Sequence, residues 1–239
     1  MVDVATSSPE RAIAELLKAC TGFRREVGRQ GEVILAGPYA LDATYNGVRL
    51  AEDFDIQLLV PGDYPASLPK VKETSGIIDS GYEHLYLDGT LCLGVRGELL
   101  LAQLESPSLV ALLDGPVRSY LYSYLFRKRY GYYPFGDRAH GAPGILHYYG
   151  ELFGETDFPT IVKLLGAVCF EEYRGHLPCP CGSGLIARKC HGEAILRLKK
   201  SGAMAAFASD LMVIIDELAN NQRLAQKRER ALRKLRRPL

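Results

Sequence analysis

The sequence has little that would carry a protein into or across a membrane. No apolar run approaches the roughly 20 residues of a membrane span, and the start of the chain lacks the basic run and long apolar stretch of a secretory signal. Charge of one sign is not in excess either: the formal net charge is +1, so the chain as a whole has no attraction for a polyanion. We therefore expect a cytoplasmic protein that binds no membrane.

A glycine-rich nucleotide loop and internal repeats are also missing, which argues against an adenylating enzyme and against a repeat array. What is present is enough apolar material for a globular fold. Of 239 residues, 47% are hydrophobic and 24% are charged. A chain of this size can bury one substantial core, alone or with a small appended module.

The first half of the chain mixes helix and strand patterns. Residues 8–10 read Ser-Pro-Glu, a hydroxyl N-cap followed by proline and an acid, which predicts the start of a helix. The apolar run 33–36 predicts a strand. The alternation of apolar and polar residues over 54–58 predicts a second strand, ended by the Pro-Gly-Asp-Tyr-Pro sequence at 61–65.

From there to Leu93 the chain is rich in Pro, Gly and single apolar residues, which predicts an irregular crossing. The Ser-Pro-Ser sequence at 106–108 predicts the start of another helix. A tyrosine-rich segment follows. We interpret its members as padding a core edge or a contact between modules, with a binding role as the alternative: Tyr120, Tyr122, Tyr124, Tyr130, Tyr132 and Tyr133.

The second half reads as mainly helical. Residues 134–144 resemble a linker, 145–153 a short helix, and 193–235 a long helix with a possible break at Gly202. The stretch 223–237 holds eight basic residues and one acid. We interpret it as a solvated helical tail. The alternative is a contact with nucleic acid or an acidic partner, but no aromatic residues interleave with its arginines to stack on bases.

Four residues of the types that bind metal ions lie close together late in the chain. Cys179, Cys181, Cys190 and His191 follow the pattern Cys-x-Cys-x8-Cys-His, with glycines that allow tight turns between them. Three thiolates and an imidazole can close a tetrahedron around zinc. Because four protein ligands leave no open coordination position, we predict a structural zinc ion. Four unligated residues are the alternative.

The segment 179–192 resembles the SEC-C motif, the zinc knot found at the C-terminus of the SecA translocation motor and on many bacterial proteins. That resemblance implies a docking or folding module, and hence a partner surface. His176, three residues before the first ligand, could orient the site from outside the ligand set or lie on the surface as an ordinary histidine.

Three cysteines remain once the metal has its ligands. Cys20 lies on the apolar face of the first predicted helix and Cys169 within an apolar run, so we expect both in the core. Cys92 lies instead between Asp88-Gly89 and Leu93-Gly94, a turn-rich setting that can hold a thiol at the surface. Asp88 is interpreted as a turn residue and not as a base.

The order of features around Cys92 resembles the ubiquitin-conjugating enzymes over most of residues 8–126. The matching pieces are a first helix, a strand region, a Pro-x-x-Tyr-Pro turn at 61–65, a second Pro-containing stretch at 68–71 and a Gly-Thr-Leu-Cys-Leu segment. In that family this last segment presents the nucleophile. The resemblance therefore implies that Cys92 carries an acyl group as a thioester.

The chain departs from the family upstream of this cysteine. Where the family has His-Pro-Asn, this sequence has Tyr82, Glu83 and His84, so a histidine stands where the family uses Asn to steady the oxyanion. His84 could donate a hydrogen bond to that oxyanion or take a proton from the attacking amine. We expect Cys92 and His84 to be the catalytic residues.

The expected function is that of a ubiquitin-conjugating-type transferase in a bacterial conjugation or anti-phage defence pathway. It would take a ubiquitin-like or other modifier from an activating enzyme supplied in trans and pass it to an amine on a protein acceptor. The alternative is a non-catalytic scaffold of the same fold with a zinc docking module.

The expected fold class is α+β, with an antiparallel sheet flanked by helices and then a helical region that carries a small zinc knot. We place the conjugating-type domain at 1–130, a linker and helical region at 131–172, the knot at 173–195, and a C-terminal helix with its basic tail at 196–239.

Overall fold

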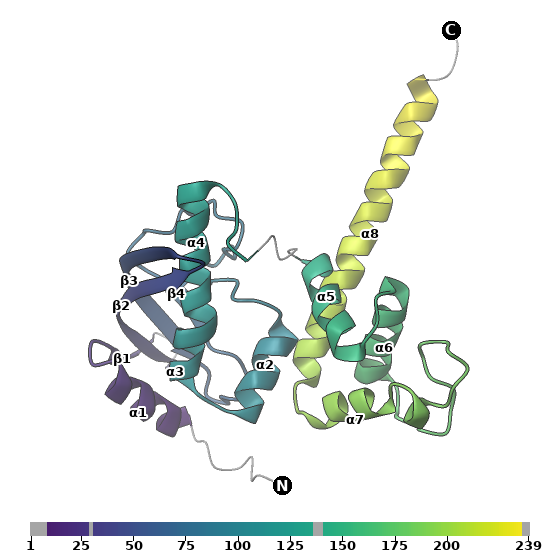
Figure 1. Ribbon diagram of the computed structural model, residues 1–239, viewed down its shortest axis with the longest axis horizontal. Coiled ribbons are helices and arrows are strands. Elements are labelled where there is room, and N and C mark those ends of the chain that lie inside the picture. The colour runs from purple at the N-terminus through teal and green to yellow at the C-terminus, as the bar shows by residue number, and fades with distance from the viewer. Residues whose placement is uncertain (1–8, 29–30, 136–140, 236–239) are drawn as a thin grey trace. The chain divides into compact units, whose positions relative to one another are not determined.

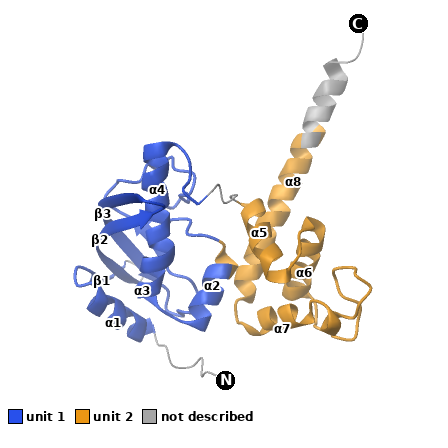
Figure 2. Ribbon diagram, in the orientation of Figure 1, with its two compact units in different colours: residues 1–94, 98–137 blue, residues 95–97, 138–239 orange. Residues whose placement is uncertain are grey.

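The computed structural model describes residues 9–28, 31–135 and 141–235, with the side chains of the last helix described through Leu224 and at Gln226. The chain divides into two compact units, drawn in separate colours in Figure 2. Unit 1 comprises residues 1–94 and 98–137, and unit 2 comprises 95–97 and 138–239. Unit 1 holds an antiparallel sheet with helices and unit 2 is helical, so the predicted α+β class is confirmed.

Unit 1 is built on a four-stranded antiparallel sheet whose strands follow one another in chain order. The two predicted strands lie inside the two long central strands, which confirms them. The third predicted feature, an irregular crossing up to Leu93, contains a short edge strand that the sequence pattern did not indicate. The strands are β1 (Arg24–Val27), β2 (Val33–Tyr45), β3 (Val48–Val60) and β4 (Lys70–Glu73).

The hairpin that joins β2 to β3 sets the register of the sheet. Tyr45 pairs with Val48 across a two-residue turn, and both turn residues have positive φ, 47° at Asn46 and 78° at Gly47. An Asn-Gly pair adopts these angles readily and matches the twist of the flanking strands. The fixed register buries alternate residues of both strands, among them Leu35 and Phe54.

Helices complete unit 1, and in Figure 1 the longest of them, α4, lies across the sheet. The helix predicted at 106–108 is confirmed: Ser108 is the N-cap of α3, and its hydroxyl accepts a hydrogen bond from the amide of Ala111. The preceding helix, α2, was not predicted. The helical segments are α1 (Pro9–Ala19), α2 (Arg96–Glu105), α3 (Leu109–Leu112), the π-helical η1 (Leu113–Val117) and α4 (Arg118–Tyr130).

The tyrosines of α4 join this helix to the rest of unit 1. Tyr120, Tyr122 and Tyr124 are buried, and their hydroxyls donate to the backbone carbonyls of His84, Val48 and Ile77 over 3.1, 2.9 and 2.6 Å. Each ring thus fills the core while its polar end finds an acceptor. These three pad the core as expected, whereas Tyr130 and Tyr132 are 41% and 61% exposed.

Unit 2 consists of helices and the loop that carries the metal-ligand pattern. The helix predicted at 145–153 lies within α5, and the break predicted at Gly202 is confirmed, because that residue has φ 85° and separates α7 from α8. The elements are α5 (Ala142–Phe153), α6 (Phe158–Phe170), the short 3-10 turn η2 (Ala187–Lys189), α7 (Gly192–Lys200) and α8 (Met204–Leu235). Among the residues that the structure describes, none of the helices has the length and apolar content to span a membrane.

A buried carboxylate lies at the centre of unit 2. Asp210 on α8 is 2% exposed, and its Oδ2 accepts from the Tyr149 hydroxyl and from the Gly97 amide, each over 2.8 Å. Burial raises the pKa of this carboxyl, and the two donors partly offset the effect. The basic tail predicted at 223–237 is helical to Leu235, but most of its side chains lie outside the described residues.

Candidate functional site

The metal-ligand pattern is folded as a tight loop in front of α7. Pro178 and Ile186 form an isolated antiparallel bridge, and the Cys179 amide donates to the Leu185 carbonyl over 2.7 Å. Gly182 and Gly184 have φ of 81° and 79°, the left-handed region that glycine enters without strain. These glycines reverse the chain between the second and third cysteines, so that all the predicted ligands come together.

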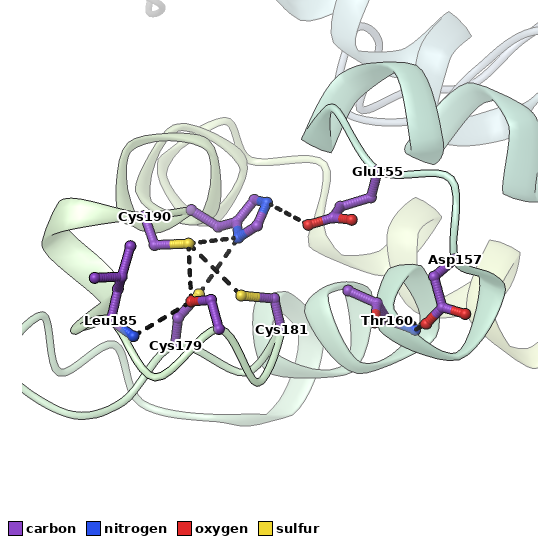
Figure 3. A network of polar contacts seen from close by, with 9 residues as sticks. Glu155, Asp157, Thr160, Cys179, Cys181, Leu185 and Cys190 are labelled. Carbon is purple, nitrogen blue, oxygen red and sulfur yellow. Dashed lines mark hydrogen bonds and ion pairs between the residues drawn. The ribbon is translucent and has the colours of Figure 1, made fainter.

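Each of the four predicted ligands offers one atom that could coordinate an ion, and these four atoms all lie within 4.8 Å of one another. His191 Nδ1 lies 3.4 Å from Cys179 Sγ and 3.2 Å from Cys190 Sγ, and the sulfurs of Cys181 and Cys190 are 3.6 Å apart. Figure 3 shows the three cysteine side chains turned toward one another. A tetrahedral ion with usual Zn–S and Zn–N bonds needs roughly 3.8 Å between sulfurs and roughly 3.5 Å between sulfur and nitrogen. These spacings are compatible with a metal site of this kind.

The pKa values of Cys179 and Cys181 are shifted in opposite directions. Burial raises the pKa of Cys179. Burial acts in the same sense on Cys181, but hydrogen bonds from Ser183 and from the neighbouring thiols outweigh it and lower the pKa of Cys181. Such a crowded set of sulfurs becomes fully ionised when a cation compensates the charge, as thiolate ligands of a metal do.

The outer nitrogen of His191 meets a residue that the sequence pattern did not single out. Its Nε2 lies 3.2 Å from the Glu155 carboxylate, which comes from the segment between α5 and α6. His176, which could have served this purpose, is exposed. Nothing in the sequence connects Glu155 with a motif that begins at residue 179, so only the fold could identify it.

Cys92 lies at the end of a second hairpin, in unit 1. The Tyr86 amide donates to the Thr90 carbonyl over 2.9 Å, and Gly89 closes the turn with φ 77°. The Asp88 carboxylate accepts from the Thr90 amide and from the Lys70 ammonium, over 3.0 and 2.9 Å. The Lys70 hydrogen bond, with those from Thr90, holds the pKa of Asp88 well below its usual range. Asp88 therefore acts as a turn residue, bound within the hairpin.

This hairpin is attached to the edge of the sheet. The Leu91 amide donates to the Val71 carbonyl of β4 over 2.8 Å, and Thr90 forms an isolated bridge with Lys72. Leu91 is 3% exposed, whereas the next residue, Cys92, is partly exposed. The buried leucine anchors this segment, and Cys92 beside it stays partly exposed.

His84 and Cys92 lie opposite one another on this hairpin. Leu85 is paired with Leu91, and one position further along the Cys92 amide donates to the His84 carbonyl over 2.9 Å. Tyr120 adjoins both residues: its ring centroid is 6.4 Å from that of His84. Burial first, and then the charge of a Cys92 thiolate, raise the pKa of the Tyr120 hydroxyl. The fold thus brings the two predicted catalytic residues together.

Aromatic rings surround the His84 imidazole. The rings of Tyr82 and Tyr133 lie 5.2 and 5.3 Å from it between centroids, and the Tyr133 hydroxyl donates to the Glu83 carboxylate. Tyr120 and Tyr133 were assigned a packing role from the sequence. Their nearness to His84 depends on how α4 and the segment after it fold back, which no local pattern reveals.

The other two cysteines outside the metal cluster were expected in the core. Both are partly buried, and Cys20 packs against the core of unit 1. Burial raises the pKa of Cys20, and it raises the pKa of Cys169 to about 11. Both thiols are therefore weaker nucleophiles at neutral pH than an ordinary cysteine.

Neither a comparison with protein-family models nor one with curated protein sequences gives a match. The fold and the site geometry define the class of protein. It is an α+β chain with a four-stranded antiparallel sheet and a helical C-terminal half. Three cysteines and a histidine at 179–191 form a group that is compatible with a metal ion.

Proposed function

We propose that this protein is a ubiquitin-conjugating-type transferase that carries a modifier as a thioester on Cys92. The observation that supports this most is the pairing of Cys92 with His84 at the end of a hairpin fixed to the sheet edge. Cys92 is partly exposed there and has an imidazole-bearing residue opposite it. A thioester carrier needs both a reachable sulfur and a group that acts on the second step.

The first step is an exchange of thioesters. The Cys92 thiolate attacks the carbonyl carbon of a modifier held on the activating enzyme, a new C–S bond forms, and the enzyme's own thiolate leaves. Because one thioester replaces another, the exchange is close to balanced in energy. The partner complex contributes by holding the thiolate and the thioester carbonyl in the geometry of attack.

The second step moves the acyl group to an amine. The nitrogen of a protein acceptor attacks the thioester carbonyl, an oxyanion forms, and the Cys92 thiolate is expelled while the nitrogen loses a proton. His84 is the residue proposed to act on this step, by donating to the oxyanion or by accepting the proton from the amine. The modifier is a ubiquitin-like or other protein with a reactive C-terminal carboxyl, within a bacterial conjugation or anti-phage defence pathway.

The metal held at Cys179, Cys181, Cys190 and His191 is proposed to be zinc in a structural role. Three sulfurs and one imidazole nitrogen are a donor set that zinc favours, and the set is closed, with no position left for a substrate. When bound, the ion cross-links the loop and the start of α7. The knot is then a folding and docking module, apart from the chemistry at Cys92.

A serine substitution tests the thioester most sharply. Cys92→Ser expressed in the protein's own cells should capture the modifier as an ester that resists thiols and is released by hydroxide, whereas the wild-type adduct is released by thiols. Cys20→Ser and Cys169→Ser are matched controls and should leave the wild-type adduct unchanged. A thiol-released adduct that persists in Cys92→Ser would contradict the proposal, and absence of any adduct would favour the scaffold alternative.

A further inference from the structure

The carboxylate of Glu155 is held against the outer edge of a metal-ligating imidazole. Its Oε1 lies 3.2 Å from His191 Nε2, and the two side chains are only 27% and 12% exposed. The cysteine sulfurs lie near the other ring nitrogen, Nδ1, and Figure 3 shows Glu155 apart from the three cysteines. An ion pair on an open surface would leave both partners freely solvated, and this pair is not.

The backbone fixes where this carboxylate points. Helix α5 ends at Phe153, Gly154 adopts φ 71°, and the Glu155 amide donates back to the Gly150 carbonyl over 2.9 Å. Two residues later Asp157 caps α6, accepting from the Thr160 amide over 3.0 Å. The connection is therefore held at both ends by helix caps, and Glu155 is presented from a short, fixed segment.

The two ring nitrogens of His191 face different partners. Nδ1 lies among the cysteine sulfurs, at 3.4 Å from Cys179 and 3.2 Å from Cys190, while Nε2 meets Glu155. A ligating nitrogen must present its lone pair to the metal, so the other nitrogen carries the hydrogen. A carboxylate at hydrogen-bonding distance from that second nitrogen selects this arrangement.

We propose that Glu155 is the positioning residue of the metal site: it accepts a hydrogen bond from His191 Nε2–H, leaves Nδ1 as the nitrogen that would ligate the metal and holds the ring in its orientation. This rests on the metal part of the proposed function. Outer partners of this kind orient the ligand and strengthen its donation, and their loss typically weakens metal binding by about 10- to 100-fold. The site then reaches beyond the loop at 179–191 to the junction of α5 and α6.

Metal titration of the full-length protein tests this. Co²⁺ affinity, measured from its absorption bands against a competing chelator, should fall about 10- to 100-fold in Glu155→Ala. Glu155→Gln keeps an acceptor oxygen without the charge and should recover part of the loss. Glu151→Ala is the control, since Glu151 lies in the same helix region in an exposed pair with His147 and should bind Co²⁺ as the wild type does.

The nitrogen that carries the hydrogen gives a second readout, one that a merely structural ion pair would not control. In wild-type protein loaded with Zn²⁺, long-range ¹H–¹⁵N NMR spectra should show His191 bound through Nδ1 and protonated at Nε2. Ligation through Nε2, or a Co²⁺ affinity of Glu155→Ala within about twofold of the wild type, would overturn the inference alone. Failure of the wild type to bind Zn²⁺ or Co²⁺ would overturn the metal site itself.

Discussion

The Cys92 amide donates a hydrogen bond to the His84 carbonyl over 2.9 Å, so the backbone sets the separation of the two residues. The turn between them is closed by Gly89 and pinned by Asp88, and the outgoing strand is anchored by buried Leu91. The side chains proposed to carry out the two chemical steps thus depend on a short hairpin. Substitutions in that hairpin should therefore change the positions of both Cys92 and His84.

His84 should matter for the second step and not for the first. In His84→Ala, capture of the modifier on Cys92 should proceed as in the wild type, while discharge onto free lysine should slow by about 100-fold, the usual contribution of a positioned acid or base. His84→Asn restores a hydrogen-bond donor and should recover part of the rate if oxyanion stabilisation is the main effect. Single-turnover discharge of charged protein measures this. Equal loss of charging and discharge would assign His84 a structural role instead.

Gly89 should be intolerant of a side chain for conformational reasons alone. Its φ is 77°, and a Cβ at this position would meet no atom within 4 Å, so the cost of Gly89→Ala is backbone strain of about 1 kcal/mol in the free energy of unfolding. Gly62→Ala is the matched control, because Gly62 also has open space around it and lacks a positive φ. Urea denaturation of both variants checks this, and equal stability of the two would contradict it.

The buried Asp210 should give unit 2 a pH dependence of definite sign. Burial raises its pKa above the ordinary 3.8 in the folded protein, so between that value and the raised one the folded state binds more protons than the unfolded chain. The free energy of unfolding therefore falls as pH rises through this window.

Asp210→Asn keeps an oxygen that can accept from Tyr149 and Gly97, and it should lack this component of the pH dependence. Denaturant midpoints across the acidic range measure the difference. The exposed Asp53→Asn is the control and should retain the wild-type slope. A slope in Asp210→Asn identical to that of the wild type would show that the buried carboxyl does not titrate differently on folding.

The metal site should bind one zinc ion per chain and should depend on each cysteine of the cluster. Cys190→Ser should lose the ion, because a serine hydroxyl is a poor zinc ligand, and unit 2 should unfold at lower temperature. Cys169→Ser should retain it. Elemental analysis of purified protein gives the stoichiometry, and zinc retained at one per chain in Cys190→Ser would contradict the assigned ligand set.

The sequence predicted those helix and strand features that depend on residues close together in the chain. The helix cap at Ser108, the strand alternation at 54–58 and the break at Gly202 follow from neighbouring residues. The ligand spacing that ends in His191 does so too, whereas the N-cap predicted at Ser8 lies outside the described residues. These features were therefore predictable from the sequence.

Other features depend on residues far apart in the chain. Strand β4 is short and exists because it pairs with β3, and α2 has a weak amphipathic pattern. The contacts of Glu155 with His191 and of Tyr120 with His84 each join two segments of one unit that lie far apart in the sequence. No spacing rule links such residues, so the sequence could not place them. The finer domain boundaries at 130, 172 and 195 stay predictions.

The most direct measurement of the central claim is the intact mass of the wild-type protein isolated from its own cells into acid without reductant. A carrier of the proposed kind should show a fraction heavier by the mass of one modifier, removed by a thiol, with Cys92 as the attachment residue in the digested peptide. A single unmodified mass from cells in which the pathway's other components are expressed, or a thiol-labile group on a different cysteine, would contradict the account.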